Sequence, residues 1–231
     1  MKKIQLLAMV VPLFFACAPD SPVTTDPVPS YLKTSLQEPS NPVNPYDYAG
    51  ALRNRILGRA LSELPKGLSE SELLIAVKEI AETDSEFQSL KTSSFTPLSL
   101  DGLQGFLQST SSISQSVNTL PLSQKAKEDY TAFSGGLLSL KDGDFESIHN
   151  YIIGFESGII NSTSYSQQDK RILLTATAIE RYSNHYRKKP KDKDWDLLIG
   201  NIMAGAEGAT YDTATAVLNS VSVEVALHGG L

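Results

Sequence analysis

The chain contains very little cysteine: Cys17 is the only one among its 231 residues. A single thiol cannot form an internal disulfide or one of the zinc sites that several cysteines ligate, so stability must come from a packed core. The sequence also lacks a long hydrophobic run. Its most apolar stretch, residues 4–15, has about 12 residues, whereas a helix that crosses a bilayer needs about 20.

The signature motifs of common enzyme classes are missing as well. The sequence has no Gly-x-Ser-x-Gly, no His-Glu-x-x-His, no phosphate-binding loop and no Gly-x-Gly-x-x-Gly. We therefore predict no catalytic residue, no cofactor and no metal ligand. A pair of acids of the glycosidase type stays an alternative, because two such carboxylates can lie far apart in a sequence.

Residues 1–16 are built like an export signal. Lys2 and Lys3 precede the apolar stretch, and Ala16 is a small residue at the expected cleavage site. Cys17 then stands at the first mature position, as the acylated cysteine of bacterial lipoproteins does. We predict that the Cys17 thiol carries a diacylglycerol. The alternative is an ordinary signal peptide followed by an incidental free thiol.

The predicted lipid on Cys17 places the mature chain on a membrane of the bacterial cell envelope. Ala18, rather than Asp, follows the cysteine, which by analogy is compatible with the outer membrane; either face remains open. Removing the two lysines of the signal leaves 18 basic and 26 acidic residues, a net charge of −8. We expect no nucleic acid partner, because a chain of this charge would be repelled.

Residues 17–45 have the composition of a linker. They hold seven of the 12 prolines, and the remainder is mainly Ser, Thr, Asn, Asp and Val. Proline does not continue a helix and lacks a backbone donor, so we predict a disordered, extended tether with a reach of at most roughly 90 Å. In the alternative, residues 31–36 pack onto the domain as an arm.

Helical periodicity begins at Tyr46 and continues through residues 46–231, which we predict to be a single domain. The interruptions are Pro65-Lys66-Gly67, the polar stretch 84–96, Pro121, Asp142-Gly143-Asp144 and the loop 161–166. Ser69 and Glu72 should form a capping box. Residues 100–117 are expected to be one helix despite their many serines. The pattern predicts an all-α bundle of about six or seven helices.

The last segment, residues 195–231, is rich in Gly and Ala. Small residues at helical spacing let another helix approach closely, which in membranes is a pairing signature. Here the apolar run is too short for a membrane helix, and Glu207 and Asp212 interrupt it. We predict a central helix of the bundle. The alternative is an exposed surface for self-association or for a partner.

One helical pattern resembles half of a di-metal site. Glu146 and His149 are three residues apart, as in the Glu-x-x-His motifs of di-iron bundles. A second motif is missing, because Tyr182 stands three residues before His185. We predict no di-metal site and expect His149 at the surface or at its boundary.

Two charged stretches near residue 190 also have simple explanations. The acids Asp192, Asp194 and Asp196 alternate like the start of a calcium loop, but Leu197 and Met203 occupy its glycine and glutamate positions. The basic run 187–193 follows the predicted helix 167–187, whose C-terminal dipole favours cations. A patch for an anionic partner is the alternative.

The stretch 44–50, Asn-Pro-Tyr-Asp-Tyr-Ala-Gly, together with Asn54 and Leu57, resembles the opening of an uncharacterised group of Bacteroidetes-type lipoproteins. Residues 173–183 and the segment after Trp195 are also similar. In that group a His-Asn pair follows, and Arg53 stands here at the His position. The resemblance implies a lipid-anchored domain and no known activity. Asp212-Thr213-Ala214 is similar to the O-glycosylation site of those bacteria, in a segment that we expect to be packed.

These observations favour a lipid-anchored envelope protein that is not an enzyme. Its helical domain would bind another envelope protein or serve an assembly. One alternative is an envelope hydrolase that acts on glycan or peptidoglycan with an unrecognised acid pair. Another is a lipoprotein that binds a small molecule in an apolar pocket between helices.

Overall fold

The computed structural model describes residues 38–108, 112–140, 143–186 and 195–228, which all belong to one compact unit. Within these ranges every element of secondary structure is an α-helix, which confirms the predicted all-α fold. Cys17 and the predicted tether up to residue 37 lie outside the described residues, and so does the alternative arm at 31–36.

The described residues form ten helices rather than six or seven. Their bounds are α1 Asp47–Glu63, α2 Glu70–Glu82, α3 Ser85–Leu90, α4 Leu100–Leu107, α5 Ile113–Thr119, α6 Gln124–Ser139, α7 Phe145–Asn161, α8 Gln167–Tyr186, α9 Trp195–Tyr211 and α10 Thr213–His228.

Polar N-caps account for the additional helices. Asp84 accepts hydrogen bonds from two backbone N–H groups and starts α3 inside the polar stretch 84–96. The predicted helix 100–117 is wrong as a single helix, because Ser112 forms a capping box with Gln115 and starts α5. The segment after Trp195 is likewise two helices, since Asp212 accepts a hydrogen bond from the Thr215 N–H at 2.7 Å and starts α10.

The predicted start and end signals of the early helices are confirmed. The Ser69 backbone N–H donates to the Glu72 carboxylate at 2.9 Å, and the Ser69 hydroxyl accepts from the Glu72 N–H at 3.4 Å. α1 ends before Pro65, and Gly67 adopts the left-handed conformation, with a φ of 80°.

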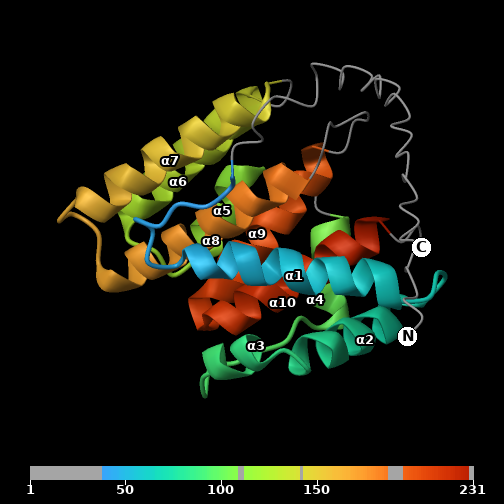
Figure 1. Cartoon of the computed structure of the whole chain (residues 1–231). Helices are drawn as coiled ribbons and strands as arrows, with labels where there is room; N and C mark the ends of the chain where they lie inside the picture. The colour runs from blue at the N-terminus through green and yellow to red at the C-terminus, as the bar shows by residue number, and fades with distance from the viewer. Residues whose placement is uncertain (1–37, 109–111, 141–142, 187–194, 229–231) are drawn as a thin grey trace, which may run out of the picture. The chain divides into compact units, whose positions relative to one another are not determined.

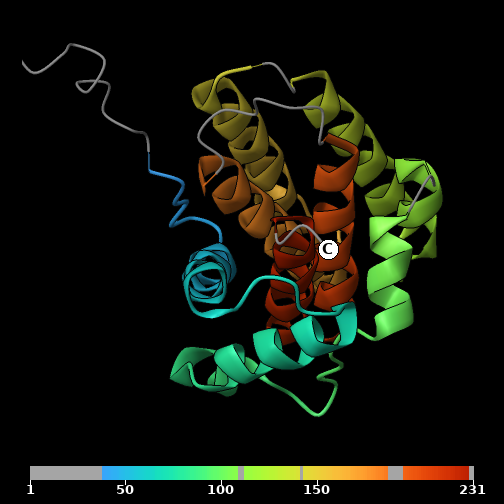
Figure 2. The same cartoon turned by 90° about the vertical axis from the view of Figure 1, so that its right-hand side faces the viewer.

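The centre of the molecule is α10, in which every residue from Thr213 to Ala226 is buried. It packs against α9, α1, α2 and α8, and α1 crosses in front of it in Figure 1. Figure 2, turned by 90°, shows α1 end-on and α10 beside α9 in the interior. A helix that is covered on all sides needs no amphipathic stripe, so α10 carries buried residues around its whole circumference.

Small residues allow α9 and α10 to pack as a close antiparallel pair. A Cβ atom on Gly208 would lie 2.5 Å from the Cα of Ala216, so the two backbones nearly touch there. A Cβ atom on Gly50 of α1 would lie 2.5 Å from the backbone oxygen of Ala178 in α8. The predicted central packing is therefore confirmed for α10, and the small residues at these contacts serve the interior rather than an exposed surface.

The helices α6 and α7 form a hairpin that contacts the rest through α8, next to α7, and through α5, next to α6. Aromatic rings fill the space between α6 and α7, with ring centroids 4.2 Å apart for Phe133 and Phe155 and 5.4 Å apart for Phe133 and Tyr151. On its other side α7 packs against α8. This arrangement puts the inner face of α7 next to the polar residues described below.

The folded part begins before the predicted boundary at Tyr46. Residues 38–45, assigned above to the tether, lie against α7 and α8, and Pro39, Asn41 and Asn44 are buried. In Figure 1 this segment leads into the start of α1. Its asparagines bond residues of α7 and α8, and these contacts cannot be inferred from the amino-acid composition that placed the boundary at Tyr46.

Candidate functional site: buried polar clusters

The most unusual chemistry among the described residues is a set of charged side chains in the core. Arg53, Glu156, Glu180, Arg181 and Glu224 are each at most 1% exposed. Removing an ion from water costs several kcal/mol, which only a close partner and further hydrogen bonds offset. These buried charges accordingly form networks of ion pairs and hydrogen bonds, and two such networks can be distinguished.

The first network, which we call the opening cluster, consists of Asn41, Asn44, Asp47, Glu156 and Arg181. The Glu156 carboxylate accepts hydrogen bonds from the side-chain amides of Asn41 at 2.5 Å and of Asn44 at 2.9 Å. Arg181 Nη2 lies 3.2 Å from Glu156 Oε1 and 2.7 Å from Asp47 Oδ1. The network thus joins the start of the domain to α7 and α8.

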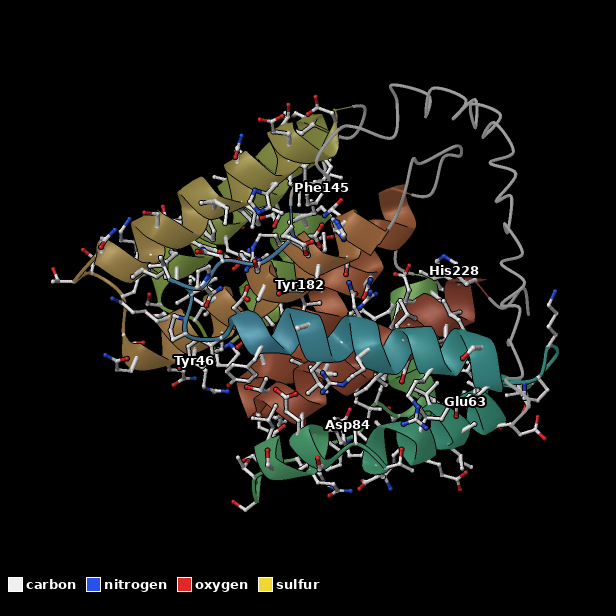
Figure 3. The ribbon with its side chains drawn as sticks, viewed as in Figure 1. Tyr46, Glu63, Asp84, Phe145, Tyr182 and His228 are labelled. Carbon is white, nitrogen blue, oxygen red and sulfur yellow. The ribbon has the colours of Figure 1, made fainter. Side chains whose placement is uncertain are left out.

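Tyr182 extends the opening cluster toward α1. Its hydroxyl donates to Asp47 Oδ2 at 3.1 Å, and Figure 3 places Tyr182 between α8 and α1. Burial and the neighbouring Asp47 charge raise the pKa of Tyr182 to about 12. The phenol therefore stays protonated at neutral pH and remains a hydrogen-bond donor.

The opening cluster gives the Asn-Pro-Tyr-Asp stretch a structural role. Asn44 also donates to the backbone oxygen of Leu174 at 3.0 Å, and Asp47 pairs with Arg181 as the first residue of α1. Asn54 donates to the backbone oxygen of Tyr182 at 2.9 Å. Asn44, Asp47 and Asn54 therefore attach the beginning of the domain to α8.

The second network, the central cluster, consists of Arg53, Asn201, Ser220 and Glu224. Arg53 Nη2 lies 3.3 Å from Glu224 Oε2, and Arg53 Nε donates to the Ser220 hydroxyl at 3.2 Å. Asn201 donates to Glu224 at 2.5 Å and accepts from Ser220 at 2.6 Å. Four side chains thus lock α1, α9 and α10 together.

Sequence reasoning did not predict either cluster, although signals were present. Arg53 stands four residues after Ala49 and three before Ile56, on the apolar stripe of α1 that faces the core. Glu224 is the only charged residue in the apolar run 221–227. A charge at a position that periodicity assigns to the core indicates a buried partner, but only the fold shows which residue it is.

The two residues of the Glu-x-x-His pattern on α7 differ in burial. Glu146 is exposed, whereas His149 is only 6% exposed, so the expectation of a surface or boundary histidine is wrong. His149 shares the α7 face that carries Ile152 and Glu156 and packs on α8. Burial, together with the nearby Arg181 charge, lowers the pKa of His149. In the described part of the chain no three potential ligands gather closely enough to hold a metal ion.

The remaining sequence patterns lie partly outside the described residues. These are the basic run 187–193 and two of the alternating acids, Asp192 and Asp194; the third, Asp196, lies in α9.

Asp212-Thr213-Ala214 is buried as expected, and Asp212 also accepts hydrogen bonds from the backbone N–H and the hydroxyl of Thr92. The stretch serves as the cap of α10 in the folded domain.

Two buried hydroxyls on α6 differ from the clusters. Tyr130 is fully buried and Ser134 is 5% exposed, yet neither hydroxyl has a hydrogen-bond partner among the described residues. They stand one helical turn apart. Burial and the charge of Glu180 raise the pKa of Tyr130, which keeps its phenol protonated.

Replacing Tyr130 by Phe should raise the free energy of unfolding by about 1 kcal/mol. The reason is that a buried hydroxyl without a partner costs free energy that an isosteric ring does not. Tyr151→Phe is the matched control: its hydroxyl donates to the Phe133 backbone oxygen at 3.1 Å, so its loss should lower stability by about 1 kcal/mol. Urea unfolding of the three proteins measures both. A clear destabilisation by Tyr130→Phe would contradict a buried hydroxyl that has no favourable interaction.

No family model, curated protein or solved structure matches the chain. Within the described ranges, no helix combines the length and hydropathy that crossing a bilayer requires.

Proposed function

We propose that the chain is a lipid-anchored protein of the bacterial cell envelope whose helical domain binds another envelope protein or serves an assembly, without catalysis. The observation that carries the proposal is the position of Cys17, directly after a signal-like segment and before a proline-rich stretch. The buried clusters support the non-enzymatic part. Their charged groups pair with one another across helices and stabilise the fold, instead of facing a substrate.

The anchor is tested by Cys17→Ser. We expect the wild-type protein to incorporate labelled palmitate and to sediment with membranes, and the variant to do neither, because an acyl chain contributes about 0.8 kcal/mol of membrane affinity per buried CH₂. The double variant Cys17→Ser/Ser21→Cys is the control, since it keeps a thiol but displaces it from the cleavage site. Retention of Cys17→Ser in the membrane fraction would contradict the anchor.

The binding role is tested by cross-linking intact cells and purifying the acylated protein from solubilised membranes. A second envelope protein recovered in stoichiometric amount supports the proposal. Recovery of the chain alone, under conditions that preserve a known envelope complex, counts against it.

One alternative function has an observation in its favour. The hydroxyls of Tyr130 and Ser134 are buried without a hydrogen-bond partner among the described residues, and a small molecule with a polar group, bound beside the stacked rings of Tyr130 and Phe133, would satisfy them. The Tyr130→Phe measurement also tests this alternative. A hydrolase would instead require two acids that share a cleft, and the buried Glu156 and Glu224 are both paired with arginine.

A further inference from the structure

We propose that residues 38–45 form a releasable latch that determines where the N-terminal chain leaves the domain, and with it the reach of the tether. Release would add eight residues of chain, or about 25–30 Å when extended. The reach part rests on the proposed lipid anchor. The latch itself rests only on contacts within the described domain.

The latch is held mainly by polar contacts. Glu38, Ser40, Pro42, Val43 and Pro45 are all exposed, with Val43 at 68%. The segment is fastened by its buried asparagines on Glu156 and by the Pro39 backbone oxygen, which accepts from Arg181. A segment that buries little apolar surface opens at a lower free energy than the core does.

Opening would leave the buried charges compensated. Arg181 keeps its contacts with Glu156 at 3.2 Å and with Asp47 at 2.7 Å, and Asp47 belongs to α1 rather than to the latch. The cost of release is therefore a few hydrogen bonds and not an unpaired buried ion. The central cluster differs, because its hydrogen bonds as well as its ion pair all join the helices α1, α9 and α10.

The segment also has its own local structure. Within it, the Asn44 N–H donates to the Asn41 backbone oxygen at 2.9 Å. The Asn41 N–H donates to Asp47 Oδ1 of α1 at 2.9 Å, which is a further contact that opening breaks. Prolines 39, 42 and 45 restrict the released chain and prevent it from extending α1. Tyr46, which packs on the core, marks the hinge.

Amide hydrogen exchange of the full chain tests the latch. We expect Asn41→Ala/Asn44→Ala to speed exchange in residues 38–45 at least tenfold and to leave α8 and α10 unchanged, because hydrogen bonds to a charged group are lost only there. Asn161→Ala is the control: this exposed asparagine at the end of α7 donates its side-chain amide to Ser157, so its replacement should change nothing in 38–45. The latch would be overturned if exchange became faster throughout α7 and α8, or if the exchange rate of residues 38–45 did not increase.

The reach is then measured on the membrane-bound protein. A dye on Ile75→Cys, which replaces a 60% exposed side chain, reports its distance from a labelled bilayer by energy transfer. In the variant Asn41→Ala/Asn44→Ala, the largest distance between the dye and the bilayer should increase. If the distribution of this distance is unchanged, the latch does not determine the reach of the tether. If the protein does not bind the bilayer at all, the anchor proposal fails, while the exchange experiment still decides the latch.

Discussion

Replacing Arg53 by Met should lower the free energy of unfolding by about 3–5 kcal/mol. The substitution removes the guanidinium from the buried Glu224 carboxylate and leaves the half-exposed His228, whose Nδ1 is 3.4 Å from Oε1, as a basic side chain beside it. Breaking a buried ion pair by removing one partner costs about this much. The loss is large against the 5–15 kcal/mol that typically stabilise a domain. Urea unfolding followed by circular dichroism measures it.

A double-mutant cycle separates the ion pair from the packing. Glu224→Gln keeps an acceptor for Asn201 and removes the charge, so Arg53→Met/Glu224→Gln should cost far less than the sum of the two single changes. Arg59→Met, on the exposed side of the same helix, should change stability much less, because the Arg59–Glu63 pair lies in solvent. Additive losses would mean that Arg53 and Glu224 do not stabilise each other.

Gly208→Ala should destabilise the domain by about 3 kcal/mol. The new Cβ atom would lie 2.5 Å from the Ala216 Cα and 2.7 Å from its backbone nitrogen, and backbone atoms cannot rotate away as a side chain does. α9 and α10 would have to separate along a contact in the centre of the core. Thermal and urea unfolding measure the loss.

Gly205→Ala is the matched control on the same helix. Its Cβ atom would meet the Ile179 side chain at 3.5 Å, an ordinary van der Waals distance. The higher helix propensity of Ala should then leave stability unchanged or raise it by up to about 1 kcal/mol. Equal losses for both substitutions would contradict a specific close approach at Gly208.

Local patterns predicted a large part of the fold. The helical periodicity from Tyr46 onward, the capping box at Ser69 and the stop at Pro65 depend on residues close in sequence, so they could be derived without knowledge of the packing partners. The division of residues 100–117 into α4 and α5 was not predicted, because local patterns can be ambiguous. Serine both weakens a helix and caps the next one, and periodicity alone does not distinguish these effects.

The candidate site was not predictable to the same degree. Asn41, Glu156 and Arg181 are separated by 115 and 25 positions, and nothing in their local sequence shows that they meet. His149 illustrates the same limit: its spacing on α7 is visible, but its burial depends on which face of α7 packs against α8.

By itself the sequence determined the helical class, most helix ends and the signal-like segment before Cys17, because composition, period and capping act over a few neighbouring residues. Only the tertiary structure decided that α10 is central, that Gly208 is a contact point and that the opening stretch is fastened to Glu156 and Arg181. These features depend on partners far apart in the chain. Burial changes the energetics of each charge or glycine only once those partners are in place.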